Sequence, residues 1–191
     1  MNKLTNKDRQ SIFYDTVEKY VPEKMINWLI ANGFFVKPAS ISHHSNHTGG
    51  LFDHSFETMQ VLVDMTRLLD LKWQQERSPY IVGMFHDLCK IDDYIDANME
   101  DVVVMGTGSP ISKSPKWVHN NDAVIKGHGD KSIILLSQFM TLTEEEIMCI
   151  KFHMGAYETS EWAAYDKAIR KYETVLWTHT ADMYASKVNG V

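Results

Sequence analysis

The chain has 191 residues, of which 44% are hydrophobic and 23% charged, and its formal net charge is −6. This length suits one domain, and the mildly acidic balance lacks the overall basic field of many nucleic-acid-binding proteins. No apolar run approaches the roughly 18 residues of a membrane span, and the first residues lack the apolar core of a signal peptide. Two cysteines are too few for a disulfide framework. We therefore expect a soluble cytosolic protein with no membrane partner.

The spacing of apolar residues predicts helices along most of the chain, over about 8–20, 22–33, 51–71, 79–91, 130–140, 143–154 and 165–187. Pro22 is expected to begin the second helix, and Thr143 with Glu146 forms a capping box. Between 97 and 127 the helical period is lost and glycine and proline are frequent. The sequence therefore predicts an all-α fold with an irregular loop or short hairpin inserted near 97–127.

A His-Asp dipeptide, His86-Asp87, lies inside an apolar stretch. Buried charge is costly unless it is paired or bound to a metal, and imidazole with carboxylate suits a divalent transition metal. The numbers of residues between this dipeptide and the other candidate ligands exceed the ligand spacing of a zinc finger. They suit a helical bundle, in which each helix supplies a ligand or two to an interior site. These further candidate ligands are His54, His128, His153 and Asp182.

Five segments resemble, in order and spacing, the motifs of the HD superfamily of metal-dependent phosphohydrolases. They read HSNHTGGLFDHS at 44–55, FHDLCKI at 85–91, GHGDKS at 127–132, KFHMG at 151–155 and WTHTADM at 177–183. The resemblance covers about residues 39–187. It implies a single HD-type helical bundle, 1–191, with the N-terminal helices 7–33 packed on this motif core.

The resemblance also implies the ligand set. His54, His86, Asp87 and Asp182 would hold a first metal, and His128 and His153 would hold a second with Asp87 as a bridge. Nitrogen ligands favour Mn, Fe, Co, Ni or Zn. Simpler relatives work with one ion, but the retention of both later histidines favours two. Some relatives have a further histidine where this chain has Met154, so a site built on that histidine is absent.

The implied reaction is hydrolysis of a phosphoester, in a nucleotide or related small phosphorylated substrate, by attack of metal-activated water. Asp87, Lys90 and Lys131 are the candidate catalytic residues, the two lysines offsetting charge on the phosphoryl oxygens. His44, Lys131 and Trp117 are candidate substrate contacts, Trp117 as a surface on which a base stacks. For both lysines the alternative is an ordinary ion pair, and His119 is expected to be solvated.

Two other functions fit the same motifs. The first is a 3′-to-5′ exonuclease on single-stranded RNA or DNA, since this branch of the superfamily contains exoribonucleases. The second is a non-catalytic, metal-dependent binding module. The insertion near 97–127 would discriminate between the enzymes, because a closed lid suits a small substrate, whereas an open basic groove with Lys113, Lys116 and Trp117 suits a strand.

Overall fold

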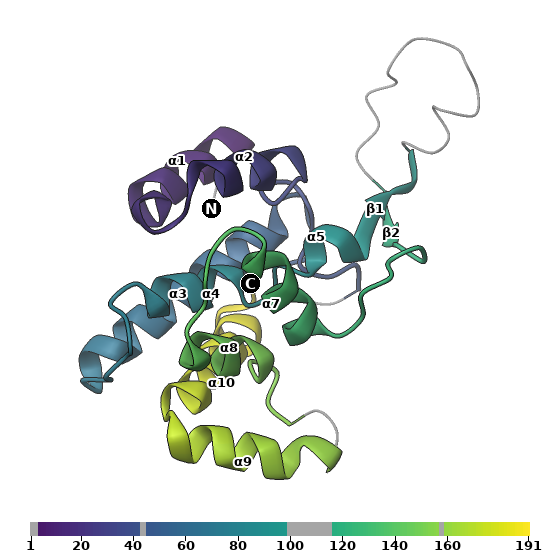
Figure 1. The fold of residues 1–191 in the computed structure, drawn as a ribbon. Helices are drawn as coiled ribbons and strands as arrows, with labels where there is room; N and C mark the ends of the chain where they lie inside the picture. The colour runs from purple at the N-terminus through teal and green to yellow at the C-terminus, as the bar shows by residue number, and fades with distance from the viewer. Residues whose placement is uncertain (1–3, 43–44, 99–115, 157–158) are drawn as a thin grey trace, which may run out of the picture.

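A computed structural model of the chain describes residues 4–42, 45–98, 116–156 and 159–191, and it is mostly helical (Figure 1). The predicted all-α fold is confirmed, since strands occupy six residues of the described part. The elements in chain order are α1 (Asn6–Thr16), η1 (Glu18–Tyr20), α2 (Glu23–Ala31), α3 (Gly50–Leu68), α4 (Ser78–Phe85), α5 (Lys90–Asp93), β1 (Tyr94–Asp96), β2 (Trp117–His119), α7 (His128–Ser137), α8 (Glu144–Lys151), η2 (Thr159–Glu161), α9 (Trp162–Lys171), α10 (Thr174–Tyr184) and η3 (Ala185–Asn189).

The N-terminal helices share the core of the helices that follow them. The ring of Phe13 on α1 lies 5.5 Å from that of Phe35 and 6.3 Å from that of Phe85 on α4. All three side chains are buried, in one cluster that extends to Ala181 of α10. Burial of each large apolar side chain contributes about 2 to 3 kcal/mol. The first two helices therefore cover the central ones rather than forming a separate unit.

Four helices, α3, α4, α8 and α10, form the centre of the molecule and pack against one another. Two glycines set how closely their neighbours approach. A Cβ on Gly83 of α4 would lie 2.4 Å from Met59 Cα, so this glycine permits α3 and α4 to touch. A Cβ on Gly129 of α7 would lie 2.5 Å from the carbonyl oxygen of Lys151, at the end of α8. Both close approaches lie within a few residues of candidate metal ligands.

The predicted helix over 79–91 is shorter than expected. It ends at Phe85, and the chain then tightens into i to i+3 hydrogen bonds, from Leu88 N to Phe85 O at 3.2 Å and from Lys90 N to Asp87 O at 3.0 Å. The amide of Cys89 donates to the hydroxyl of Ser132 on α7, at 3.0 Å. This bond to another helix holds the turn, so Asp87 lies on the turn and not on a continuous helix.

The single helix predicted over 165–187 is wrong, because α9 and α10 are separate helices. Tyr172 between them is extended, with φ −138° and ψ 100°. The hydroxyl of Thr174 donates to buried Glu145 of α8 at 2.7 Å, and the Tyr172 hydroxyl donates to Glu144 at 3.2 Å. These bonds to α8 fix the break, which apolar periodicity does not reveal. The chain then continues past α10 through one π-helical turn.

A short hairpin base is present where the sequence predicts a loop or hairpin. Strands β1 and β2 are antiparallel, with Tyr94 opposite His119 and Asp96 opposite Trp117. The first strand precedes the expected boundary at 97. Residues 99–115, which include Lys113, lie outside the described part of the chain.

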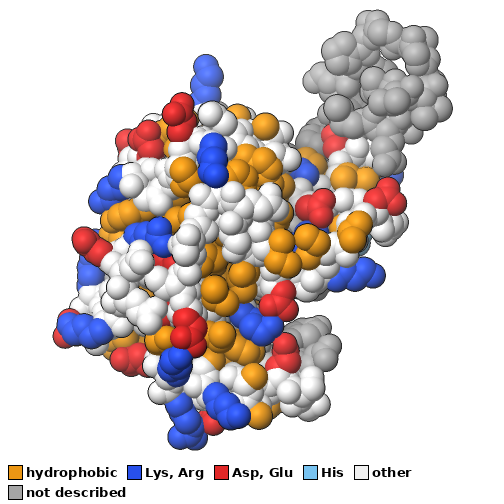
Figure 2. Space-filling view, in the orientation of Figure 1, with side chains coloured by type: hydrophobic (Ala, Val, Ile, Leu, Met, Phe, Trp, Pro, Cys, Tyr) orange, Lys and Arg blue, Asp and Glu red, His pale blue; other side chains and the backbone are white. Residues whose placement is uncertain are grey.

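Charged side chains of both signs are interspersed with hydrophobic ones on the face drawn in Figure 2. This mixture is typical of a solvated surface. Within the described residues, no helix combines the length and the apolar character needed to cross a membrane.

Candidate metal centre

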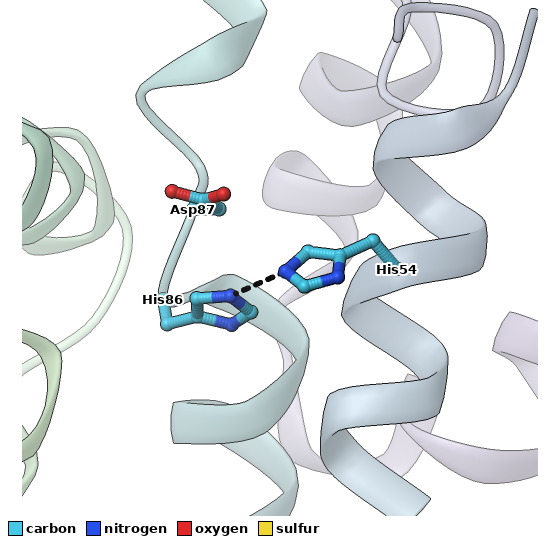
Figure 3. Close-up of side chains that lie close together, drawn as sticks. All are labelled: His54, His86 and Asp87. Carbon is cyan, nitrogen blue, oxygen red and sulfur yellow. Dashed lines mark hydrogen bonds between the residues drawn. The ribbon is translucent and has the colours of Figure 1, made fainter. Parts of the chain in front are cut away.

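Five of the predicted ligands converge in the interior. His54 comes from α3, His86 from the end of α4, Asp87 from the following turn, His153 from just after α8 and Asp182 from α10. The three histidines are at most 1% exposed, and the side chains of Asp87 and Asp182 are 10% and 15% exposed. Figure 3 shows His54 and His86 pointing toward each other, with Asp87 on the turn beyond α4. Distant segments thus deliver nitrogen and oxygen donors to one buried point.

Three of the four donor–donor distances below match those of ligands that share an ion. Nε2 of His54 lies 3.2 Å from Nε2 of His86 and 3.1 Å from Oδ1 of Asp182. Nε2 of His86 lies 3.8 Å from the same carboxylate oxygen, and Nε2 of His153 lies 3.4 Å from Oδ1 of Asp87. Ligands bound at about 2.0 to 2.2 Å are separated by about 2.8 to 3.6 Å in tetrahedral or octahedral geometry. The spacing therefore fits a transition metal.

The other ring nitrogen of each buried histidine is held by a backbone oxygen. Nδ1 of His54 donates to Val191 O at 3.1 Å, Nδ1 of His86 to Gly83 O at 2.8 Å, and Nδ1 of His153 to Ile150 O at 2.7 Å. A backbone oxygen only accepts, so each Nδ1 carries its hydrogen. In the neutral imidazoles this leaves the lone pairs on the three Nε2 atoms, which face the centre.

Lone pairs that face one another across about 3 Å repel unless a cation separates them. The pair formed by His54 and His86, with the Asp182 carboxylate beside it, therefore requires a proton or a metal ion between its members. Nδ1 held by an acceptor and Nε2 presented to an ion is the usual arrangement of a ligating histidine. The residues present thus fit a divalent transition metal, and these buried groups could hold one.

The electrostatics of the centre agree with this chemistry. Burial penalises imidazolium and lowers the pKa of His86 to about 4. Burial also opposes the charged form of Asp182, but the hydrogen bond from His54 and the nearby imidazoles outweigh it and lower the pKa of the carboxyl to about 2. Against the same effect of burial, Asp182 raises the pKa of His54 and Asp87 raises that of His153. The carboxylates thus stay ionised and attract cations.

His128 differs from the other three histidines. It is the first residue of α7, and its side chain is 45% exposed. Its Nδ1 lies 3.0 Å from the ammonium of Lys90 and 3.8 Å from Oδ1 of Asp87. An ammonium only donates, so Nδ1 of His128 accepts, and in the neutral ring the hydrogen is on Nε2. His128 thus presents a donor and not a lone pair.

A cavity of about 520 Å³ opens onto the centre. Asp87, His153 and Asp182 lie in its wall together with Lys90 and His128. Its volume is within the range of small-molecule sites. The donors of the centre are therefore accessible to a ligand from one side.

The remaining candidates lie elsewhere. The ammonium of Lys131 forms ion pairs with Asp92 and Asp93, each at 2.7 Å, and the structure does not bring Lys131 to this cavity. Trp117 is on β2 and is not among the residues of the wall. Its indole nitrogen is buried with no hydrogen-bond partner in the described part of the chain. His44 lies outside the described residues.

Three contributors escaped the sequence reasoning. Tyr94 and His119 line the cavity, with ring centroids 5.4 Å apart, and His119 is exposed, as expected. Their pairing across two strands has no sequence signal, because a long segment separates them. Val191 orients His54 from 137 residues away. Cys89 also lies near Asp87, but burial raises the pKa of its thiol well above the usual value, and the protonated thiol is a poor ligand.

Protein-family models, curated proteins and solved structures were all compared with the chain, and none matches it significantly. Membership of the HD superfamily therefore stays a prediction from the five sequence motifs. The chemistry of the centre is the basis for a functional proposal.

Proposed function

We propose that this chain is a metal-dependent phosphohydrolase that cleaves a phosphoester bond in a nucleotide or related small phosphorylated substrate. One observation carries the proposal. Three buried histidines, each with Nδ1 fixed by a backbone oxygen, direct Nε2 atoms at two carboxylates beside an open cavity. Imidazole nitrogens and carboxylate oxygens that converge at a buried point are stabilised by a bound cation.

We assign one divalent transition metal, Mn, Fe, Co, Ni or Zn, to His54, His86, Asp87, His153 and Asp182. When bound, such an ion supplies a Lewis acid that polarises a phosphoryl oxygen and makes water more acidic. The five residues hold two carboxylates and three imidazoles, a mixed donor set that suits these ions better than Mg²⁺.

The assignment of one ion, where the sequence favours two, follows from the position of Lys90. Its ammonium lies against Nδ1 of His128, the atom nearest to Asp87 in that ring. A second cation beside Asp87 and His128 would have to displace this ammonium. Lys90 is only 8% exposed, and the charge of Asp87 favours its protonated form. Lys90 therefore supplies the second positive charge.

Lys90 and His128 have a role in binding the substrate. The Lys90 ammonium and the Nε2 hydrogen of His128 are donors in the cavity wall beside Asp87. Donors at this place stabilise negative charge on phosphoryl oxygens and gain strength where water is excluded. They thus orient the phosphate against the centre and offset the charge that develops during cleavage.

The test is metal content together with hydrolysis. Protein purified without chelator is expected to contain about one equivalent of transition metal by elemental analysis. Reloaded with Mn²⁺, Co²⁺ or Zn²⁺, it is expected to hydrolyse nucleotides or p-nitrophenyl phosphoesters. In His86→Gln, both the metal and the activity are expected to be lost.

The matched control is His47→Gln. His47 is a half-exposed histidine whose Nε2 contacts Asp53 at 2.9 Å, and it does not line the cavity. This variant is expected to keep metal and activity. Metal without hydrolysis of any phosphoester would favour the non-catalytic binding module. Absence of metal after reconstitution would contradict both the hydrolase and the binding module.

A further inference from the structure

Two helices carry donors of the cavity wall, and two parallel contacts join these helices. Lys90 begins α5, and its ammonium lies 3.0 Å from Nδ1 of His128, which begins α7. Asp93 is three residues after Lys90, and Lys131 is three residues after His128. The Lys131 ammonium lies 2.7 Å from Oδ1 of Asp93. Because residues three apart share a helix face, the second contact lies one turn beyond the first on both helices.

The Lys131 side chain is buried, and its ammonium is charged. It is 1% exposed, and the ammonium also lies 2.7 Å from Oδ2 of Asp92. A buried ammonium is costly unless it is paired. Burial opposes the charged form, but the hydrogen bonds to the two carboxylates outweigh this effect and raise the pKa of Lys131. Lys131 therefore stays charged, and it engages both carboxylates of α5.

Asp93 is also a neighbour of Lys90. Both residues line a second cavity, of about 360 Å³, which adjoins the one that opens onto the metal centre. The two cavities share four residues, Lys90, Tyr94, His119 and His128. Asp93 lines the second cavity but not the first. Oppositely charged side chains three apart on a helix attract each other. An unpaired Asp93 would therefore draw the Lys90 ammonium into the second cavity, away from the metal centre.

We propose that Lys131 is a positioning residue for the reaction. By pairing with Asp93, it keeps this carboxylate from capturing the Lys90 ammonium, which stays directed at the phosphate. This inference rests on the proposed function. Lys131 does not line the cavity of the metal centre, so it acts on the substrate only through Lys90. A donor stabilises the charge of the reaction only where that charge develops. A displaced Lys90 therefore lowers turnover although every metal ligand remains in place.

The test removes the charge of Lys131 and then the carboxylate that it engages. Lys131→Met keeps an unbranched, apolar stem, and Lys131→Met/Asp93→Asn also removes the competing charge. Should Lys131→Met fail to fold, Lys131→Gln, which keeps a hydrogen-bond donor, takes its place in both variants. Lys151→Met is the matched control, since Lys151 pairs with Asp130 of α7 at 2.7 Å but lines neither cavity.

Each variant is loaded with Mn²⁺ and assayed on p-nitrophenyl phosphate and bis(p-nitrophenyl) phosphate. In Lys131→Met, kcat is expected to fall at least about tenfold with unchanged metal content, because Lys90 no longer offsets phosphoryl charge. The further change Asp93→Asn is expected to restore kcat to within about threefold of the wild type, because no charge at this position then attracts Lys90. The control is expected to keep the kcat of the wild type. A merely structural ion pair would not give this recovery, because the second substitution repairs no packing.

A second measurement does not need turnover. In Zn²⁺-loaded protein, the chemical shift of His128 Nδ1 reports the hydrogen bond from Lys90. This shift is expected to change in Lys131→Met and to return in the double variant. Unchanged kcat and chemical shift in Lys131→Met, or equal losses of kcat with and without Asp93→Asn, would overturn the role of Lys131 and leave the proposed function standing. If the metal-loaded wild type hydrolyses no phosphoester, both proposals fail, so the two failures are distinguishable.

Discussion

The inner and outer halves of the site use the same residue type in opposite ways. In the inner half, His54, His86 and His153 are buried and donate from Nδ1 to backbone oxygens. In the outer half, His128 is 45% exposed and accepts at Nδ1 from Lys90. The partner of Nδ1 decides what the other nitrogen offers, because a neutral imidazole has one donor and one acceptor.

On the proposed function, this difference separates metal ligands from a substrate contact. The neutral inner histidines would offer lone pairs to a cation, whereas His128 would offer a hydrogen to an anion. Burial reinforces the contrast, since it disfavours imidazolium at His86, the most enclosed ring. We therefore expect changes in the inner half to alter metal binding, and changes in the outer half to alter turnover.

The largest expected effect comes from exchanging one histidine in each half. His153→Gln removes a ligand and is expected to weaken metal binding at least about hundredfold. His128→Gln is expected to change metal affinity by less than about threefold, while kcat falls by about tenfold to a thousandfold. Metal titration by calorimetry and steady-state kinetics measure the two effects. Equal loss of metal in both variants would instead support an ion held by His128.

A smaller effect is expected from the backbone oxygen that orients His54. A chain ending at Gly190 lacks the acceptor of Val191 and is expected to bind metal about ten- to hundredfold more weakly, as is usual for such supporting groups. Val191→Ala keeps this backbone oxygen and is the control. Nitrogen chemical shifts of the His54 ring check the tautomer directly. An unchanged tautomer in the shortened chain would contradict this role for residue 191.

The smallest effect is that of pH on metal affinity. Carboxylates raise the pKa of His54 and of His153, so the metal-free centre retains protons to a higher pH than free imidazole does. Metal binding must release these protons, and below the raised pKa values the affinity is expected to fall up to about tenfold per pH unit for each proton released. Calorimetry in two buffers with different ionisation enthalpies counts the protons. Affinity that is constant from about pH 8 to about pH 5.5 would exclude this competition.

Part of the fold and most of the centre could be predicted from the sequence. Apolar periodicity predicted the helices, and Thr143 with Glu146 does form the expected capping box. The five residues of the inner centre were all candidates. The cost of buried charge pointed to His86, Asp87 and Asp182, and the resemblance to the HD superfamily implied the ligand set as a whole. Local sequence patterns were sufficient for these predictions, because the predictions depend only on residue type and on spacing along the chain.

Where helices end, and which side chains reach the site, depended on contacts between distant segments. The separation of α9 from α10, the turn that carries Asp87, and the ion pairs that keep Lys131 from the cavity each involve partners remote in sequence. No local signal distinguishes Lys131 from Lys90, because each follows a candidate ligand by a few residues. Hydrogen bonds across the fold decide which lysine reaches the site.

The sequence by itself determined that the chain is helical and that histidines and aspartates on separate helices form an interior site. Only the tertiary structure decided which nitrogen each histidine presents, that Tyr94 and His119 line one wall, and that a second cavity adjoins the one that opens onto the centre. The physical reason is that periodicity records which face of a helix is buried. The direction of a hydrogen bond and the shape of a cavity depend on atoms that only the folded chain brings together.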